Sequence, residues 1–387
     1  MIRGFLMVSV LLLIACSTQA QTTKAGVLVI GNGSNAIGAS IQSAVSGATT
    51  VLLLPDPGFA PGKPEGLPSG IAAELQKRMT EGNVSAATAL KSWTDTIKKL
   101  TIVRGTPWIK IKRSGGGWNV ALTGGKTIKA EVLVHADATG KLNSELQLPA
   151  IQKQWNPFNY DDFLYRTSVA GGKMLDDGTS NLLLFSSLTL PNQENLVLLD
   201  PKQESLSAGQ AAGATAAYAA FYKVKVSQAK LKAIQGELLH YKLALLPFAD
   251  VGLADSNWRA IQMVGVSGFL KAELSHGTAY FRPDQPVRIE ELEEPVKSFY
   301  YKAQIWFDDH KGKEMTLATT LDMMAYVGGL SLQHTTAEVQ KNWKKGYHFS
   351  TDFEPGRIVS RREFAVLANQ YLKPFNITFD KAGKVQR

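Results

Sequence analysis

Residues 26–55, GVLVIGNGSNAIGASIQSAVSGATTVLLLP, decide the fold of this chain. They begin with an apolar run rich in β-branched residues, 27–30, which is typical of a buried parallel strand. Gly31 and Gly33 follow at once, and glycine lets the backbone turn tightly there. The next residues, 35–45, have the composition of a helix, and a second apolar strand ends at Leu54.

The order of strand, glycine turn, helix and strand predicts the first half of a Rossmann unit. In such a unit the helix N-terminus faces the pyrophosphate of a dinucleotide. The third glycine of the usual pattern is replaced by Ala36. The acidic residue expected on the ribose hydroxyls is replaced by Leu54, and Asp56 is the nearest carboxylate. The sequence predicts a dinucleotide site built on Gly31, Gly33, Ser34, Asn35 and Ala36.

Residues 1–20 have the pattern of a secretory signal peptide, with Arg3 ahead of an apolar run that is too short to span a membrane. Two cleavage positions remain open. Cleavage after Ala20 gives a secreted or periplasmic protein. Cleavage before Cys16 gives a lipoprotein anchored to the membrane through that residue.

Composition limits the other functional classes. The chain has 387 residues, of which 44% are hydrophobic and 19% charged, which suits a globular protein of two domains. Cys16 is the only cysteine, so the mature chain can form neither an internal disulfide nor a thiolate metal site. The six histidines lack metal-ligand spacing, and no metal is expected. The net charge of +9 is scattered, without a nucleic-acid-binding motif, and predicts a solvated basic surface.

The segment between the two halves of the pattern carries loop and hairpin signals. Residues 55–70 are dense in proline and glycine and predict an extended loop at the cofactor edge of the sheet. Helices are predicted over 71–79 and 86–99, and hairpin strands over 100–129 with Trp108, Ile109 and Ile111 in the core.

Two further segments end or begin in small residues that let a ligand or another backbone approach. Residues 131–140, EVLVHADATG, predict a buried strand that contains His135 as a core histidine. Residues 208–221, AGQAAGATAAYAAF, predict a helix whose first turn lies against another backbone or a flat ring. Asp161 and Asp162 are adjacent and predict a turn or capping pair rather than an acid/base pair.

The order of these motifs resembles the secreted bacterial FAD-dependent oxidoreductases of the glutathione-reductase-like fold, some of which carry the label xanthan lyase. The resemblance covers about residues 25–221. It implies that the glycine turn holds the FAD pyrophosphate, that DATG lies near the adenosine half, and that the helix opened by GQAAG points at the flavin pyrimidine. The matching positions are Gly31, Gly33, Ala138, Thr139, Gly140, Gly209, Gln210 and Gly213. Leu54 and Lys141 depart from the family pattern, so FAD binding is expected to be weak or lost.

Beyond residue 246 a pattern is duplicated. Residues 281–292 match residues 353–364, and each copy opens a predicted helix, over 290–302 and 362–372. With a preceding helix over 258–270, these units resemble S-layer homology repeats. Such a pair would serve as a packing module or as a wall anchor.

Together these features predict an α/β protein with a Rossmann-like FAD-type domain over residues 21–246, a parallel sheet and a β-hairpin insertion, followed by a mainly helical domain over 247–387. The substrate region, about 141–195, is reduced. The predicted function is an FAD-dependent oxidoreductase acting on a carbohydrate or another small molecule, with no catalytic residue assigned. The alternative is an inactive descendant that binds carbohydrate or the cell envelope.

Overall fold

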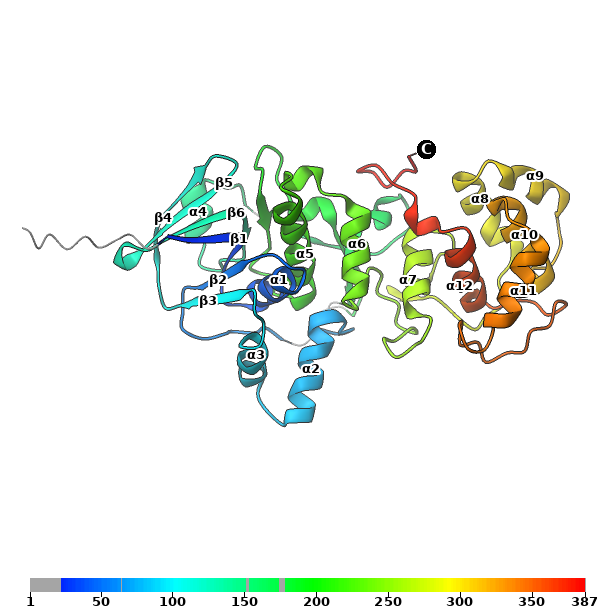
Figure 1. Cartoon of the computed structure of the whole chain (residues 1–387), viewed down its shortest axis with the longest axis horizontal. Coiled ribbons are helices and arrows are strands. Elements are labelled where there is room, and N and C mark those ends of the chain that lie inside the picture. The colour runs from blue at the N-terminus through cyan, green and yellow to red at the C-terminus, as the bar shows by residue number, and fades with distance from the viewer. Residues whose placement is uncertain (1–21, 64, 151–152, 174–177, 387) are drawn as a thin grey trace, which may run out of the picture.

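The computed structural model describes residues 22–63, 65–150, 153–173 and 178–386 (Figure 1). The predicted signal peptide and Cys16 lie outside the described residues. The predicted fold class is confirmed: a mostly parallel central sheet with helices on its faces is followed by a helical region that contains one short two-stranded ribbon.

The central sheet has seven strands, and its parallel part runs in the order β3-β2-β1-β6. Strand β1 lies between β2 and β6, with Val27 opposite Thr50 on one side and Val132 on the other. A further parallel strand, β10, pairs with the end of β6 on that strand's other side from β1. The strand bounds are β1 Thr22–Ile30, β2 Thr50–Leu54, β3 Leu100–Arg104, β6 Thr127–His135 and β10 Leu196–Leu198. Because these strands are parallel, their carboxyl ends meet at one edge.

The predicted hairpin insertion is formed by β4 (Trp108–Ser114) and β5 (Gly117–Leu122), which join β6 as antiparallel strands. Trp108 and Ile111 are buried as predicted, but the prediction for Ile109 is wrong because its side chain is 64% exposed. The register between β4 and β5 shifts between Trp108 and Lys110. Such a bulge adds a residue to one strand and changes which side chains face the core.

Alternate residues of β1 face two different helical layers. Val27 and Val29 belong to the cluster that holds α5 (Leu206–Tyr222) and parts of α1 (Ser34–Val45). Leu28 and Ile30 face the other side, toward α4 (Lys141–Leu146) and the hairpin. The outer face of α1 is covered by α2 (Gly70–Gly82) and by α3 (Ala86–Thr94), which ends earlier than predicted.

The reduced region between β6 and β10 contains a small antiparallel sheet in the order β7-β9-β8 (Trp155–Pro157, Ser180–Leu184 and Ser168–Lys173). The predicted turn role of the aspartate pair is confirmed. Asp162 accepts a hydrogen bond from Leu164 N at 2.7 Å, and Asp161 N donates to Asn159 Oδ1 at 3.1 Å.

The helical region contains both copies of the duplicated pattern. Its elements are α7 Trp258–Ser267, β11 Glu273–Ser275, β12 Thr278–Tyr280, α8 Ile289–Phe299, α9 Lys302–Asp309, α10 Leu317–Gly328, α11 Leu332–Asn342 and α12 Arg361–Tyr371. In both copies a glutamate bonds back to the residue before the helix: Glu291 accepts from Arg288 N and Glu363 from Ser360 N, each at 2.8 Å. The copies also pair, because Val287 N donates to the carbonyl of Val359 at 3.0 Å. Helices α10 and α11 were not predicted.

A buried lysine joins α6 (Leu231–His240) to the end of the chain. The ammonium of Lys232 lies 4.1 Å from the ring centre of Phe379 and 4.5 Å from that of Phe375. Its nitrogen is buried and has no hydrogen-bond partner among the described residues, while the residue as a whole is half-buried. Burial, with the Arg166 guanidinium adding to it, lowers the pKa of Lys232 to about 7.

This lysine predicts a dependence of stability on pH. In the unfolded chain the amine keeps its ordinary pKa, so its contribution to stability is present at high pH and is lost as the pH falls toward 7. Replacing it by Lys232→Met should therefore raise the free energy of unfolding at pH 6 by about 1–3 kcal/mol. Urea unfolding at pH 6 measures this, with the exposed Lys230→Met as the control. A Lys232→Met protein less stable than wild type at pH 6 would contradict the conclusion that the buried amine destabilises the fold when it is protonated.

Candidate functional site

The N-termini of α1 and α5 converge at the carboxyl edge of the central sheet because the two helices touch through their backbones. A Cβ atom on Gly38 would overlap the Leu206 carbonyl oxygen, and one on Gly209 would overlap that of Asn35. Further along α5, a Cβ on Gly213 would overlap the carbonyl oxygen of Ala39. The prediction that the small residues of this helix lie against another backbone is confirmed.

The glycine turn between β1 and α1 lies directly against the end of β6. Gly31 has φ of 146°, and a Cβ there would overlap the Ala136 carbonyl oxygen. The next turn residue, Gly33, has ordinary φ, so its lack of a side chain serves a different purpose. A Cβ on Gly33 would overlap the carboxylate of Glu204.

Glu204 occupies the N-terminus of α1, where the sequence predicts a phosphate. Its Oε2 accepts a hydrogen bond from Asn35 N at 2.8 Å. Burial raises the pKa of Glu204 above its ordinary value; the hydrogen bond from Asn35 opposes the rise and the charge of Asp200 adds to it. The sequence analysis did not single out Glu204, which lies 169 residues from Asn35.

The polar side chains of Asn35 and Ser34 in the turn also form hydrogen bonds within the protein. Asn35 Nδ2 donates to the Asp200 carbonyl at 2.9 Å, and Ser205 N donates to Asn35 Oδ1 at 3.1 Å. The hydroxyl of Ser34 accepts from Gly62 N at 2.8 Å.

Asn32, between the two turn glycines, donates to the carboxylate of Asp56 at 3.0 Å. Asp56, the nearest carboxylate to the missing ribose acid, therefore contacts the glycine turn. Leu54 is fully buried in the core, and its apolar side chain offers no hydrogen-bond acceptor to a ribose.

A second carboxylate, Glu65, occupies the N-terminus of α5. Its Oε1 accepts from Ser207 N and from the Ser205 hydroxyl, both at 2.9 Å. Its Oε2 accepts from the Ser207 hydroxyl. Each of the two converging helix N-termini thus holds a carboxylate from another part of the chain, as expected for the positive end of a helix dipole.

The DATG segment follows β6 at the same edge. Ala138 and Thr139 are exposed, and Gly140 has φ of 76° and begins α4. Asp137 accepts from Thr139 N and Leu142 N, each at 3.0 Å, so its carboxylate is used to start α4.

His135 is the core histidine that the sequence predicts. Its Nε2 lies 2.6 Å from Asn143 Oδ1, and its Nδ1 accepts from Asp137 N at 3.1 Å. Burial lowers the pKa of His135. The ring is buried and fully hydrogen-bonded, which leaves it no free nitrogen for acid/base chemistry.

Gln210 is not directed toward the glycine turn. Its Oε1 accepts from Ile71 N at 2.8 Å and its Nε2 donates to Gln42 Oε1 at 2.8 Å. The side chain therefore ties α5 to α1 and α2.

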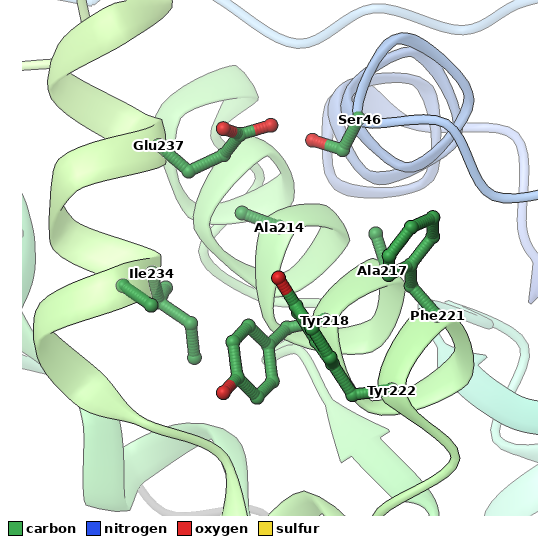
Figure 2. Close-up of a pocket in the computed structure, with 9 residues that line it drawn as sticks. Ser46, Ala214, Ala217, Tyr218, Phe221, Tyr222, Ile234 and Glu237 are labelled. Atoms are coloured by element: carbon green, nitrogen blue, oxygen red, sulfur yellow. The ribbon is translucent and has the colours of Figure 1, made fainter.

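A separate pocket lies at the opposite end of α5 (Figure 2). It has a volume of about 280 Å³ and lies between the end of α5, α6 and Ser46 after α1. Three aromatic residues line it, of which Phe221 is 64% and Tyr222 59% exposed. Ligands of open α/β sheets bind at the carboxyl ends of the strands, so this pocket is distinct from the predicted site. Among the described residues, no cluster of histidine, cysteine, aspartate or glutamate could hold a metal ion.

No family model and no curated protein matches this chain. Many solved structures are similar to parts of it. They include GidA from Aquifex aeolicus, with 16% identity and a TM-score of 0.23 over 29% of this chain and 25% of that chain. Thioredoxin reductase from T. acidophilum has 20% identity and a TM-score of 0.19, over 30% and 35% of the two chains. The p-nitrophenol 4-monooxygenase PnpA from Pseudomonas putida has 10% identity and a TM-score of 0.31, over 58% and 85%. The chain therefore matches about a quarter to a third of the first two proteins.

The backbone contact between α1 and α5 predicts an unusual response to alanine. Glycine to alanine inside a helix normally stabilises by about 1 kcal/mol. Gly213→Ala should instead lower the free energy of unfolding by about 1–3 kcal/mol, because its Cβ would overlap α1. The matched control is Gly236→Ala in α6, where the nearest atom to a Cβ is 4.0 Å away and the ordinary gain is expected. Urea unfolding compares the two, and stabilisation by both changes would contradict the packing.

Proposed function

We propose that this chain is a flavoprotein, an FAD-dependent oxidoreductase. The observation that supports this best is the meeting of two helix N-termini, those of α1 and α5, at the carboxyl edge of a parallel sheet beside a glycine turn. Both ends present main-chain N–H donors, from Asn35 and Ser207, and both hold an anionic group. An FAD molecule presents oxygen acceptors at two separated points, its pyrophosphate and its flavin ring, and needs hydrogen-bond donors at both.

The main-chain N–H donors at the two helix N-termini are groups that bind phosphate and carbonyl oxygens, which FAD carries. The first turn of α1, with Gly31, Gly33, Ser34, Asn35 and Ala36, would hold the pyrophosphate, because Asn35 N already donates to an anionic group there and Gly33 leaves a space without a Cβ atom beside it. The first turn of α5 would face the flavin ring. When bound, the flavin supplies the capacity to accept and return electrons, and the protein's part is to bind, orient and shield it.

Substrate and location belong to the same proposal. We infer a small-molecule substrate, which includes carbohydrates, and a secreted or periplasmic location, with an anchor at Cys16 as the alternative form. No helix among the described residues is long and apolar enough to span a membrane. The competing function, an inactive descendant that binds carbohydrate or the cell envelope, is favoured by one observation: carboxylates already occupy both helix N-termini.

Flavin content tests the proposal. Purified protein should carry less than one equivalent of FAD, because Leu54 removes the usual ribose contact, a loss of about tenfold to a hundredfold in affinity. Gly33→Val should carry none, since its side chain would fill the space at the N-terminus of α1. Flavin absorbance after heat release measures both.

The control is Gly356→Val, in the loop before α12, where a Cβ would meet nothing within 4 Å. This variant should keep the flavin content of wild type. A Gly33→Val protein that keeps its flavin would contradict the proposed pyrophosphate position, and a wild-type protein that cannot be loaded with FAD would contradict the function.

A further inference from the structure

We propose that Glu204 and Glu65 are internal ligands that close the cofactor site, so that FAD binding is coupled to release of residues 200–205 and of the loop residues 55–63 and 65–69. This inference rests on the proposed function, because it concerns regulation of the same site. The two glutamates would occupy the helix N-termini in place of the cofactor until it binds.

Asn35 holds the first of the two segments at three points. Its main-chain N–H donates a hydrogen bond to the Glu204 carboxylate at 2.8 Å. Its side-chain amide donates to the carbonyl of Asp200 and accepts from the N–H of Ser205. One residue in the first turn of α1 thus holds both ends and the carboxylate of the segment that leads into α5. Release of Glu204 from Asn35 removes one of the three hydrogen bonds that fix this short segment.

Glu65 holds the second segment in the same way. Through its bonds to Ser205 and Ser207 it fixes the loop to the first turn of α5. The loop is also fixed to the glycine turn, because Ala60 N donates to the carbonyl of Asn32 at 2.8 Å and Gly62 N to the Ser34 hydroxyl. A Cβ on Gly62 would lie 3.2 Å from that of Glu204, so the two closing segments are in contact.

Charge makes these carboxylates and a bound pyrophosphate mutually exclusive. A phosphate oxygen and the Glu204 carboxylate would need the same N–H of Asn35. Placing two phosphate charges beside Glu204, whose charge already interacts with that of Asp200, would bring like charges together. The cofactor can therefore enter only when Glu204 leaves, and Glu65 must release the loop that covers the turn.

The test compares Glu204→Ala, Glu65→Ala and the control Glu81→Ala, an exposed change on α2. Full-length protein freed of flavin is titrated with FAD and followed by the quenching of flavin fluorescence. Both site variants should bind FAD at least about tenfold more tightly than wild type, since each loses charge-assisted hydrogen bonds that compete with the cofactor. The control should bind as wild type does.

Hydrogen exchange measured without FAD gives a second readout. In both site variants the amides of the loop 55–63 and of Asn35 should exchange faster than in wild type, while those of β1 should not change. Glu204→Gln keeps the size of the side chain and removes its charge. It should show a smaller gain in FAD affinity, which provides a test if the alanine variant fails to fold.

Each outcome decides the proposal. Equal FAD affinity in wild type and in both site variants would overturn the closing role and leave the flavoprotein assignment intact. Weaker binding by Glu204→Ala would make Glu204 a cofactor ligand and would also overturn it. No FAD binding by any folded variant would overturn the proposed function, and the coupling with it.

Discussion

The backbone contact between α1 and α5 is the constraint on which the rest of the structure depends. Gly38 on one helix and Gly209 and Gly213 on the other leave no room for side chains, so the helix axes approach closely and their N-termini are brought together. Together with the sheet and with α2 and α3, this contact buries nearly all of α1, and most of α5 is buried as well. Glycines in this position lower helix propensity, and the close packing that they allow compensates for that loss.

This contact also determines where Glu204 lies. Gly209 is fixed against Asn35, and Glu204 precedes it by little more than one helical turn, so its carboxylate reaches the first turn of α1. Helix N-termini attract anions, and in this chain two of its own carboxylates bind there. The fold therefore offers a dinucleotide site and a means of closing it with the same hydrogen-bond donors.

The local parts of this arrangement could be predicted from the sequence, and the long-range parts could not. The strand, turn and helix around Gly31 follow from apolar periodicity and glycine placement, which are local properties. Ile109 was misplaced because the bulge beside it changes which residues face inward, and alternation alone does not reveal a bulge. Glu204 and Glu65 were missed because their partners lie 169 and 142 residues away. Their only local signal is a charged residue near a glycine-rich segment, which is common on protein surfaces.

The most direct test of the account is a crystal structure of the full chain grown with excess FAD. The account predicts that a pyrophosphate oxygen accepts the hydrogen bond from Asn35 N and that the Glu204 carboxylate has moved away from it. The flavin should lie against the first turn of α5. FAD bound elsewhere, such as in the aromatic pocket of Tyr218 and Tyr222, with Glu204 still on Asn35, would contradict it.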